Sequence, residues 1–152
     1  MLDLLRTITD QFNGKSATPE PTGQDPMRLA AGALLLEMGS VDGRLDGSEK
    51  DLVMGLLQRL FDLSEAEATE LMVEAGEAQA ASADFFKFTE PLKRDMAFED
   101  RIQIVEALWE VALSDGVVHD YEASLVRRVC GLLHVPDKES GAARKRAGAR
   151  RR

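Results

Sequence analysis

An internal repeat constrains this chain more than any other feature of its sequence. Placing Asp115 on Asp42, an offset of 73 residues, aligns the stretch LLLEMGSVDGRLDGSEKDLVMGLLQRL with ALWEVALSDGVVHDYEASLVRRVCGLL. The apolar positions 52, 53, 56, 57 and 60 fall on positions 125, 126, 129, 130 and 133, and both sets follow one face of a helix. The pattern predicts a duplicated helix–loop–helix whose two copies pack around one core.

Three acidic residues recur at matching places in the two copies, in the shared pattern E-x4-D-G-x5-E. They are Glu37, Asp42 and Glu49 in the first copy and Glu110, Asp115 and Glu122 in the second. Each set bridges the end of one predicted helix and the start of the next. These six carboxylates are therefore the candidate site.

Four of these acids have a local structural interpretation. Glu49 and Glu122 fall in the first turn of their helices, where a carboxylate accepts hydrogen bonds from free N–H groups and gains roughly 0.3 to 1 kcal/mol from the helix dipole. Asp42 and Asp115 each precede a glycine, which fits a tight turn with a positive φ at that glycine. Helix capping and turn formation therefore account for all four without a ligand.

The other two acids lie where the helix dipole disfavours them. Glu37 and Glu110 fall in the last turn of their helices, so a compensating cation is expected, either an arginine such as Arg44 or Arg127 or a bound metal ion. If the two loops converge, four to six carboxylates would offer the hard oxygen ligands that Ca²⁺ or Mg²⁺ selects. The residues alone leave structural acids and a divalent metal site as open alternatives, and they indicate no organic cofactor.

The rest of the chain reads as helices and turns, with no strand-like alternation. The spacing predicts an all-α domain over residues 26–140, with Pro91 kinking or ending the helix expected from residue 82 and Pro136 stopping the last helix. Residues 1–25 are expected to form a short amphipathic helix, over residues 2–12, and a flexible linker. This helix either docks on the core or serves as a detachable anchor to a membrane or partner.

Charge is unevenly distributed along the chain. The net charge is -8, from 27 acidic and 19 basic residues, and six of the basic residues lie after residue 143, leaving a body of 13 basic and 27 acidic residues with charge -14. A body this acidic argues against nucleic-acid binding by the folded surface. The basic tail, residues 141–152, is expected to be disordered, and is either a solvated end or a weak contact to an anionic membrane or nucleic acid.

The sequence carries no set of residues for catalysis. Neither His119 nor His134 belongs to a nucleophile–base motif, and Cys130 lies in an apolar helical pattern that predicts a buried, inert thiol. The sequence shows no secretory signal and no apolar run of the roughly 20 residues that span a bilayer. The expectation is a non-enzymatic, cytoplasmic protein.

At the repeat the chain resembles the tellurite-resistance TerB-like family, which includes the domain before the J-domain of some membrane-tethered co-chaperones. The resemblance covers about residues 27–139, and its most specific part is Arg101 leading into the run LWEVA, then Asp115-Gly116 and Glu122. It implies about seven helices in two pseudo-twofold halves and an acidic cluster that binds divalent metal in some relatives. The chain departs from this pattern at His119, which stands where the first half has Asp46.

The resemblance implies a cytoplasmic domain that takes part in the response to tellurite, metal or general stress. Its expected mechanism is divalent-cation binding between the two acidic loops, coupled to an unidentified protein partner. The alternative is a metal-free protein–protein interaction module whose acids are structural.

Overall fold

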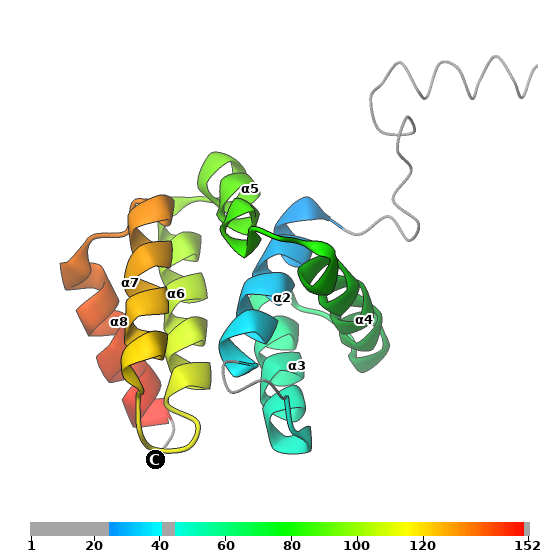
Figure 1. Ribbon diagram of the computed structural model, residues 1–152, viewed down its shortest axis with the longest axis horizontal. Coiled ribbons are helices and arrows are strands. Elements are labelled where there is room, and N and C mark those ends of the chain that lie inside the picture. Colours follow the sequence, from blue (N-terminus) through cyan, green and yellow to red (C-terminus); the bar gives the residue numbers. More distant parts are fainter. Residues whose placement is uncertain (1–24, 41–44, 151–152) are drawn as a thin grey trace, which may run out of the picture.

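The computed structural model describes residues 25–40 and 45–150, which form a bundle of helices with no strand among them (Figure 1). The α-helices of this part are α2 (Pro26–Gly39), α3 (Gly47–Phe61), α4 (Glu65–Ala81), α5 (Thr89–Asp95), α6 (Phe98–Ala112), α7 (Asp120–Leu133) and α8 (Asp137–Arg150), and the short 3-10 helix η1 (Phe85–Phe88) precedes α5. The all-α prediction is confirmed. The helix expected over residues 2–12 and its linker up to residue 24 lie outside the described residues.

Side-chain caps fix where the helices of the repeat begin. Asp46 caps α3 by accepting a hydrogen bond from the N–H of Glu49, while Glu49 accepts from the N–H of Asp46 at 3.1 Å. At the start of α7, Glu122 accepts from the N–H of His119 at 3.0 Å. These contacts satisfy N–H groups that have no partner inside the helix. The capping role predicted for Glu49 and Glu122 is confirmed.

The repeat extends over three helices in each half. Helices α2, α3 and α4 form the first half, and α6, α7 and α8 form the second; α4 packs mainly on α2, and α8 packs mainly on α6. In Figure 1 the two halves lie side by side, with α5 at one end of the bundle between them. Helix α2 also contacts α6, which joins the two halves through one apolar core.

The disorder predicted for residues 141–152 is wrong through residue 150, because these residues continue α8. The small residues Ser140, Ala143 and Ala147 are buried along one face of α8. The same spacing of three and then four residues recurs in α4, where Ala68, Leu71 and Ala75 are buried. Alanine has the highest helix propensity, and two acids in the first turn with Arg150 in the last match the helix dipole. The domain therefore extends beyond residue 140.

The prolines do not end helices as predicted. Pro91 lies within the first turn of α5, where its missing N–H would have no helical partner in any case, so the helix continues to Asp95. Helix α7 ends at Leu133, before Pro136 is reached, because His134 adopts the left-handed conformation with φ 59°. Asp62 ends α3 in the same way with φ 56°.

The core is built from α2 and the helices around it. Nearly every residue from Ala30 to Met38 in α2 is buried, since α2 has neighbours on several sides. Gly32 permits the close approach of α4, because a Cβ atom at this position would lie 2.9 Å from the Cβ atom of Ala75. Cys130 is 2% exposed, which confirms its predicted burial. No helix in the described residues is long and apolar enough to cross a membrane.

Candidate metal centre between the repeated loops

The two glutamates at the helix ends are held by other protein side chains. Glu37, near the end of α2, accepts a hydrogen bond at 2.7 Å from Nε2 of Gln79 in α4. Glu110, near the end of α6, is 3% exposed and forms ion pairs with Arg59 at 2.7 Å and Arg150 at 3.1 Å. Their carboxylates therefore contact side chains of α3, α4 and α8.

The compensating cation predicted at these helix ends is present for Glu110 but comes from elsewhere in the sequence. It is supplied by Arg59, at the end of α3, and by Arg150, at the end of α8, and not by Arg127. Arg44 lies outside the described residues. Among the described residues, the hydrogen-bond partner of Glu37 is the neutral amide of Gln79.

Asp115 forms the turn that the sequence predicts. Its Oδ1 accepts a hydrogen bond from the N–H of Val117 at 3.1 Å, and Gly116 between them has φ 87°. The left-handed conformation favours glycine, so the Asp-Gly pair shapes this loop. The Oδ2 atom lies 3.6 Å from Nε2 of His119. The matching residues Asp42 and Gly43 lie outside the described residues.

Glu122, in the first turn of α7, is an acid of the candidate set whose surroundings shift its pKa. The residue is 8% exposed, and burial raises the pKa of its carboxyl above the ordinary value of 4.5, with smaller contributions in the same direction from the charges of Asp115 and Glu49. The hydrogen bond from the N–H of His119 acts in the opposite direction. The carboxylates of Glu49 and Asp115 therefore lie near enough to repel that of Glu122.

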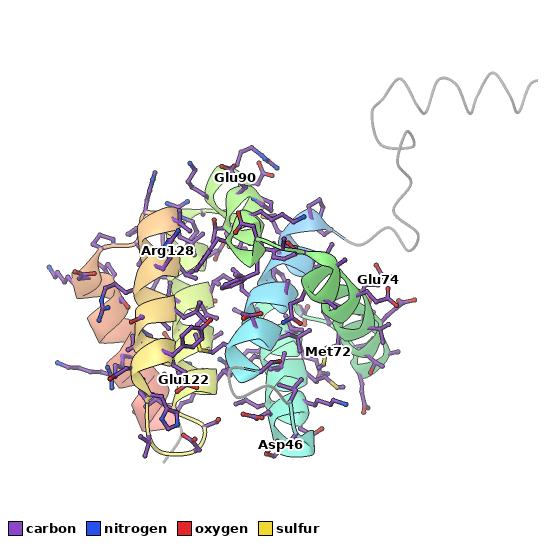
Figure 2. All side chains as sticks on the ribbon, viewed as in Figure 1. Asp46, Met72, Glu74, Glu90, Glu122 and Arg128 are labelled. Carbon is purple, nitrogen blue, oxygen red and sulfur yellow. The ribbon has the colours of Figure 1, made fainter. Side chains whose placement is uncertain are left out.

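The start of α3 lies close to the α6–α7 loop. A cavity of about 400 Å³ lies between the start of α3 and the loop from α6 to α7, and it is lined by Asp46, Ser48, Glu49, Asp51, Leu52, Ser114 and Asp115. None of these lining residues is basic. Figure 2 shows Asp46 and Glu122 near the same end of the molecule, one in each half. Within the described part of the chain, however, no three potential metal ligands are already clustered to hold an ion.

A second group of charged residues was missed by the sequence analysis. Glu106 and Glu110 are four residues apart on α6, and Arg146 and Arg150 are four residues apart on α8. Glu106 is 6% exposed and pairs with Arg146 at 2.7 Å and also with Arg150. The equal spacing of these two acids and two arginines is the sequence pattern that could have predicted their pairing. Two arginines of the predicted tail, Arg146 and Arg150, therefore form ion pairs with α6.

Two three-helix halves, with an acidic cavity between the start of α3 and the α6–α7 loop, define the described part of the chain as a duplicated all-helical domain. Residues 28–145 match the family model described as tellurite resistance protein TerB. The chain belongs to the TerB family. Neither the curated proteins nor the solved structures gave a match to this chain.

Proposed function

We propose that this TerB domain acts by binding a divalent cation, Ca²⁺ or Mg²⁺, in the acidic cavity between the start of α3 and the α6–α7 loop. The observation that carries the proposal is the lining of that cavity, which joins carboxylates of both halves and includes no basic residue. Membership of the family described as tellurite resistance protein TerB supports a role linked to tellurite resistance. We extend the proposal to a response to tellurite, metal or general stress, without catalysis.

The chemistry of the side chains narrows the candidate ligands. Glu37 and Glu110 do not fit, because neither lines the cavity and the carboxylate of Glu110 is already paired with Arg59 and Arg150. Glu49 and Asp115 fit better, since both line the cavity and each uses one oxygen in a cap or turn, so that its carboxylate keeps further lone pairs. Glu122 does not line the cavity, but it lies near enough to both for their charges to raise the pKa of its carboxyl. Ca²⁺ takes six to eight oxygen ligands, so water and further oxygens would complete its shell. Asp42, outside the described residues, is the remaining candidate from the first loop.

A bound cation would supply positive charge where the carboxylates of Glu49 and Asp115 repel that of Glu122. The chain's own residues would hold it from two separate segments, the first turn of α3 and the α6–α7 loop, so binding would tie the two halves together at this end. It would also favour the ionised form of Glu122, and so lower the pKa of that carboxyl. Because the ion binds only the folded protein, it would stabilise the fold.

The proposal is tested by titrating Ca²⁺ and Mg²⁺ into chelator-stripped protein, with calorimetry and thermal unfolding as readouts. At a free ion concentration of about 100 times Kd, the expected stabilisation is roughly 2.7 kcal/mol. The variant Asp115→Asn should lose both signals. The matched control Glu37→Gln should keep them, because Glu37 lies outside the proposed set. Absence of heat and of a melting shift in the parent protein, or equal binding by Asp115→Asn, would refute the cation site.

A metal-free interaction module remains the second candidate, and one observation favours it. Val117 and Tyr121 are 57% and 53% exposed beside the acidic loop, where they offer apolar contact area to a protein partner. In this case the acids serve as caps and turn formers alone. A melting temperature that does not respond to chelator or added ion, together with loss of partner binding in Tyr121→Ala, would favour this function over the first.

A further inference from the structure

Helices α4 and α8 occupy matching places at opposite edges of the bundle (Figure 1). Helix α4 packs mainly on α2, the first helix of its half, and α8 packs in the same way on α6. Their buried residues follow one spacing with an offset of 72 residues: Ala68, Leu71 and Ala75 in α4, and Ser140, Ala143 and Ala147 in α8. The side of each helix opposite its buried residues, here called its outer face, therefore lies at one edge of the molecule.

The outer face of α4 is acidic, since the helix contains five glutamates and no basic residue. Helical spacing places Glu70 and Glu77 on this face with Val73 between them; both glutamates are exposed, and Val73 is 56% exposed. Arg28 of α2 acts on the first turn of α4, where its charge, after the hydrogen bonds of the cap, lowers the pKa of Glu67. Within the described residues neither Glu70 nor Glu77 forms an ion pair. The middle of this face is therefore a negative surface around one apolar side chain.

The outer face of α8 is basic. The helix contains five basic residues and two acids, and both acids lie in its first turn. Arg146 and Arg150 are paired with acids of α6, so their charges are neutralised within the fold. Lys138 and Lys145 lie on the outer face, are exposed, and form no ion pair with residues 25–40 or 45–150. The residues beside them on this face are glycine and alanine, so the two lysines supply its charge.

The charges on the two faces have the same spacing. Glu70 and Glu77 are seven residues apart, and so are Lys138 and Lys145, which places the two charges of each pair about 10.5 Å apart along the helix axis. When the two faces lie side by side, parallel or antiparallel, each glutamate can meet one lysine. The glycine and alanine residues around the lysines leave space for the side chain of Val73.

We propose that the outer face of α4 in one copy of the chain docks against the outer face of α8 in a second copy. The two faces lie at opposite edges of each copy, so a contact between two copies leaves one acidic and one basic face exposed for further copies. The assembly is therefore a head-to-tail row and not a closed dimer.

The association is weak, because the net charge of -8 makes the copies repel each other and the contact area is small. One helix face against another covers less than about 1,000 Å², the size of a specific stable interface. Added salt screens exposed ion pairs, so it should dissociate the row. Association through apolar contacts alone would instead strengthen, since salt also screens the repulsion between two acidic molecules.

Sedimentation velocity of the full chain, in chelator and at low salt, tests the proposal over the micromolar to millimolar concentration range. The average mass should rise beyond that of a dimer as the concentration increases. Glu70→Lys/Glu77→Lys and Lys138→Glu/Lys145→Glu should each weaken the association by at least about tenfold, because like charges then face each other. An equimolar mixture of the two variants should regain it, since the reversed α4 of one variant meets the reversed α8 of the other.

A matched control makes the same change in charge away from both faces. Glu90→Lys/Asp100→Lys, at exposed positions of α5 and α6, takes the net charge from -8 to -4 by two reversals of two units each, as the α4 variant does. The control should keep or strengthen the association, because it lowers the general repulsion and leaves both faces intact.

Four outcomes would overturn the proposal: a parent protein that stays monomeric, an association that ends at a dimer, an equal loss in the control, or a mixture that does not regain association. If the parent stays monomeric and Lys138→Glu/Lys145→Glu instead abolishes binding to phosphatidylserine vesicles, the outer face of α8 belongs to a membrane surface. Because the chelator removes divalent ions, none of these outcomes bears on the cation site.

Discussion

Replacing Arg146 and Arg150 together with alanine should remove the ion pairs that hold α8 on α6. In the parent protein Glu106 is 6% exposed and is paired with both arginines, so the double variant removes both ion pairs that this carboxylate forms within the described residues. Glu110 keeps Arg59 at 2.7 Å. The perturbation therefore isolates one buried charge.

The magnitude follows from the burial of the two sides of the pair. Removing one partner of a fully buried ion pair costs roughly 3–5 kcal/mol, because the remaining charge stays out of water. The side chains of Arg146 and Arg150 are 49% and 46% exposed, so water reaches the pair and the cost falls to the lower end of that range. We expect a loss of about 3 kcal/mol in the free energy of unfolding.

Urea unfolding followed by tryptophan fluorescence measures this loss directly. Trp109 is the only tryptophan of the chain, and it lies at the interface in question, with Nε1 donating to Oγ of Ser140 at 3.0 Å and the guanidinium of Arg144 4.7 Å from its ring. Arg94→Ala is the control, since its pair with Asp95 is exposed and worth about 0–1 kcal/mol.

Adding Glu106→Leu to the double variant should recover most of the lost stability, because no buried charge is then left unpaired. A double variant that unfolds within about 0.5 kcal/mol of the parent protein would refute the reasoning, since exposed pairs alone have so small an effect. So would a loss that disappears in about 1 M salt, where the screening length is near 3 Å and only exposed pairs are weakened.

Three further predictions concern single side chains. The pKa of Glu122 is raised in the folded state, so ionisation of this carboxyl lowers the free energy of unfolding at high pH, and this loss disappears as the pH falls toward 4.5. Glu122→Gln removes the ionisable group and should therefore make the urea midpoint depend less on pH between about pH 4 and 7. An unchanged curve would contradict the raised pKa. Gly32→Ala should destabilise the protein by about 1–3 kcal/mol in thermal unfolding, because the added Cβ would lie 2.9 Å from the Cβ of Ala75. The control Gly55→Ala should stabilise α3 by about 0.5–1 kcal/mol, because no atom lies within 4 Å of the added Cβ. Burial raises the pKa of the Cys130 thiol, so its reaction with a thiol reagent should be slow in the folded protein and fast in urea; rapid reaction of the folded form would show that the thiol is accessible.

The sequence predicted the helices that carry an apolar stripe. Positions such as Val53 and Val126 recur at one spacing in both copies, and their side chains are fully buried. The caps at Glu49 and Glu122 were also predictable, because a capping contact spans only three residues and needs no knowledge of the rest of the fold.

The same reasoning failed where a helix is held by small residues and distant charges. Helix α8 buries Ala143 and Ala147 in place of an apolar stripe, and its arginines pair with acids on α6, so its sequence reads as a polar tail. The partner of Glu110 could not be predicted either, because Arg59 lies 51 residues away in the sequence. Such contacts depend on which helices become neighbours, which local spacing does not determine.

Glu37 and Glu110 occupy matching positions but have different partners, and this difference affects the order in which substitutions can accumulate in the two halves. Within residues 25–40 and 45–150, Glu37 has the neutral amide of Gln79 as its partner, so a substitution at this position breaks no ion pair of that part of the chain. Glu110 pairs with both Arg59 and Arg150, so neutralising it first would remove this ion pair from Arg59 and leave Arg150 with Glu106. Substitutions at positions 59, 110 and 150 should therefore be epistatic, because the effect of each depends on the residues present at the other two.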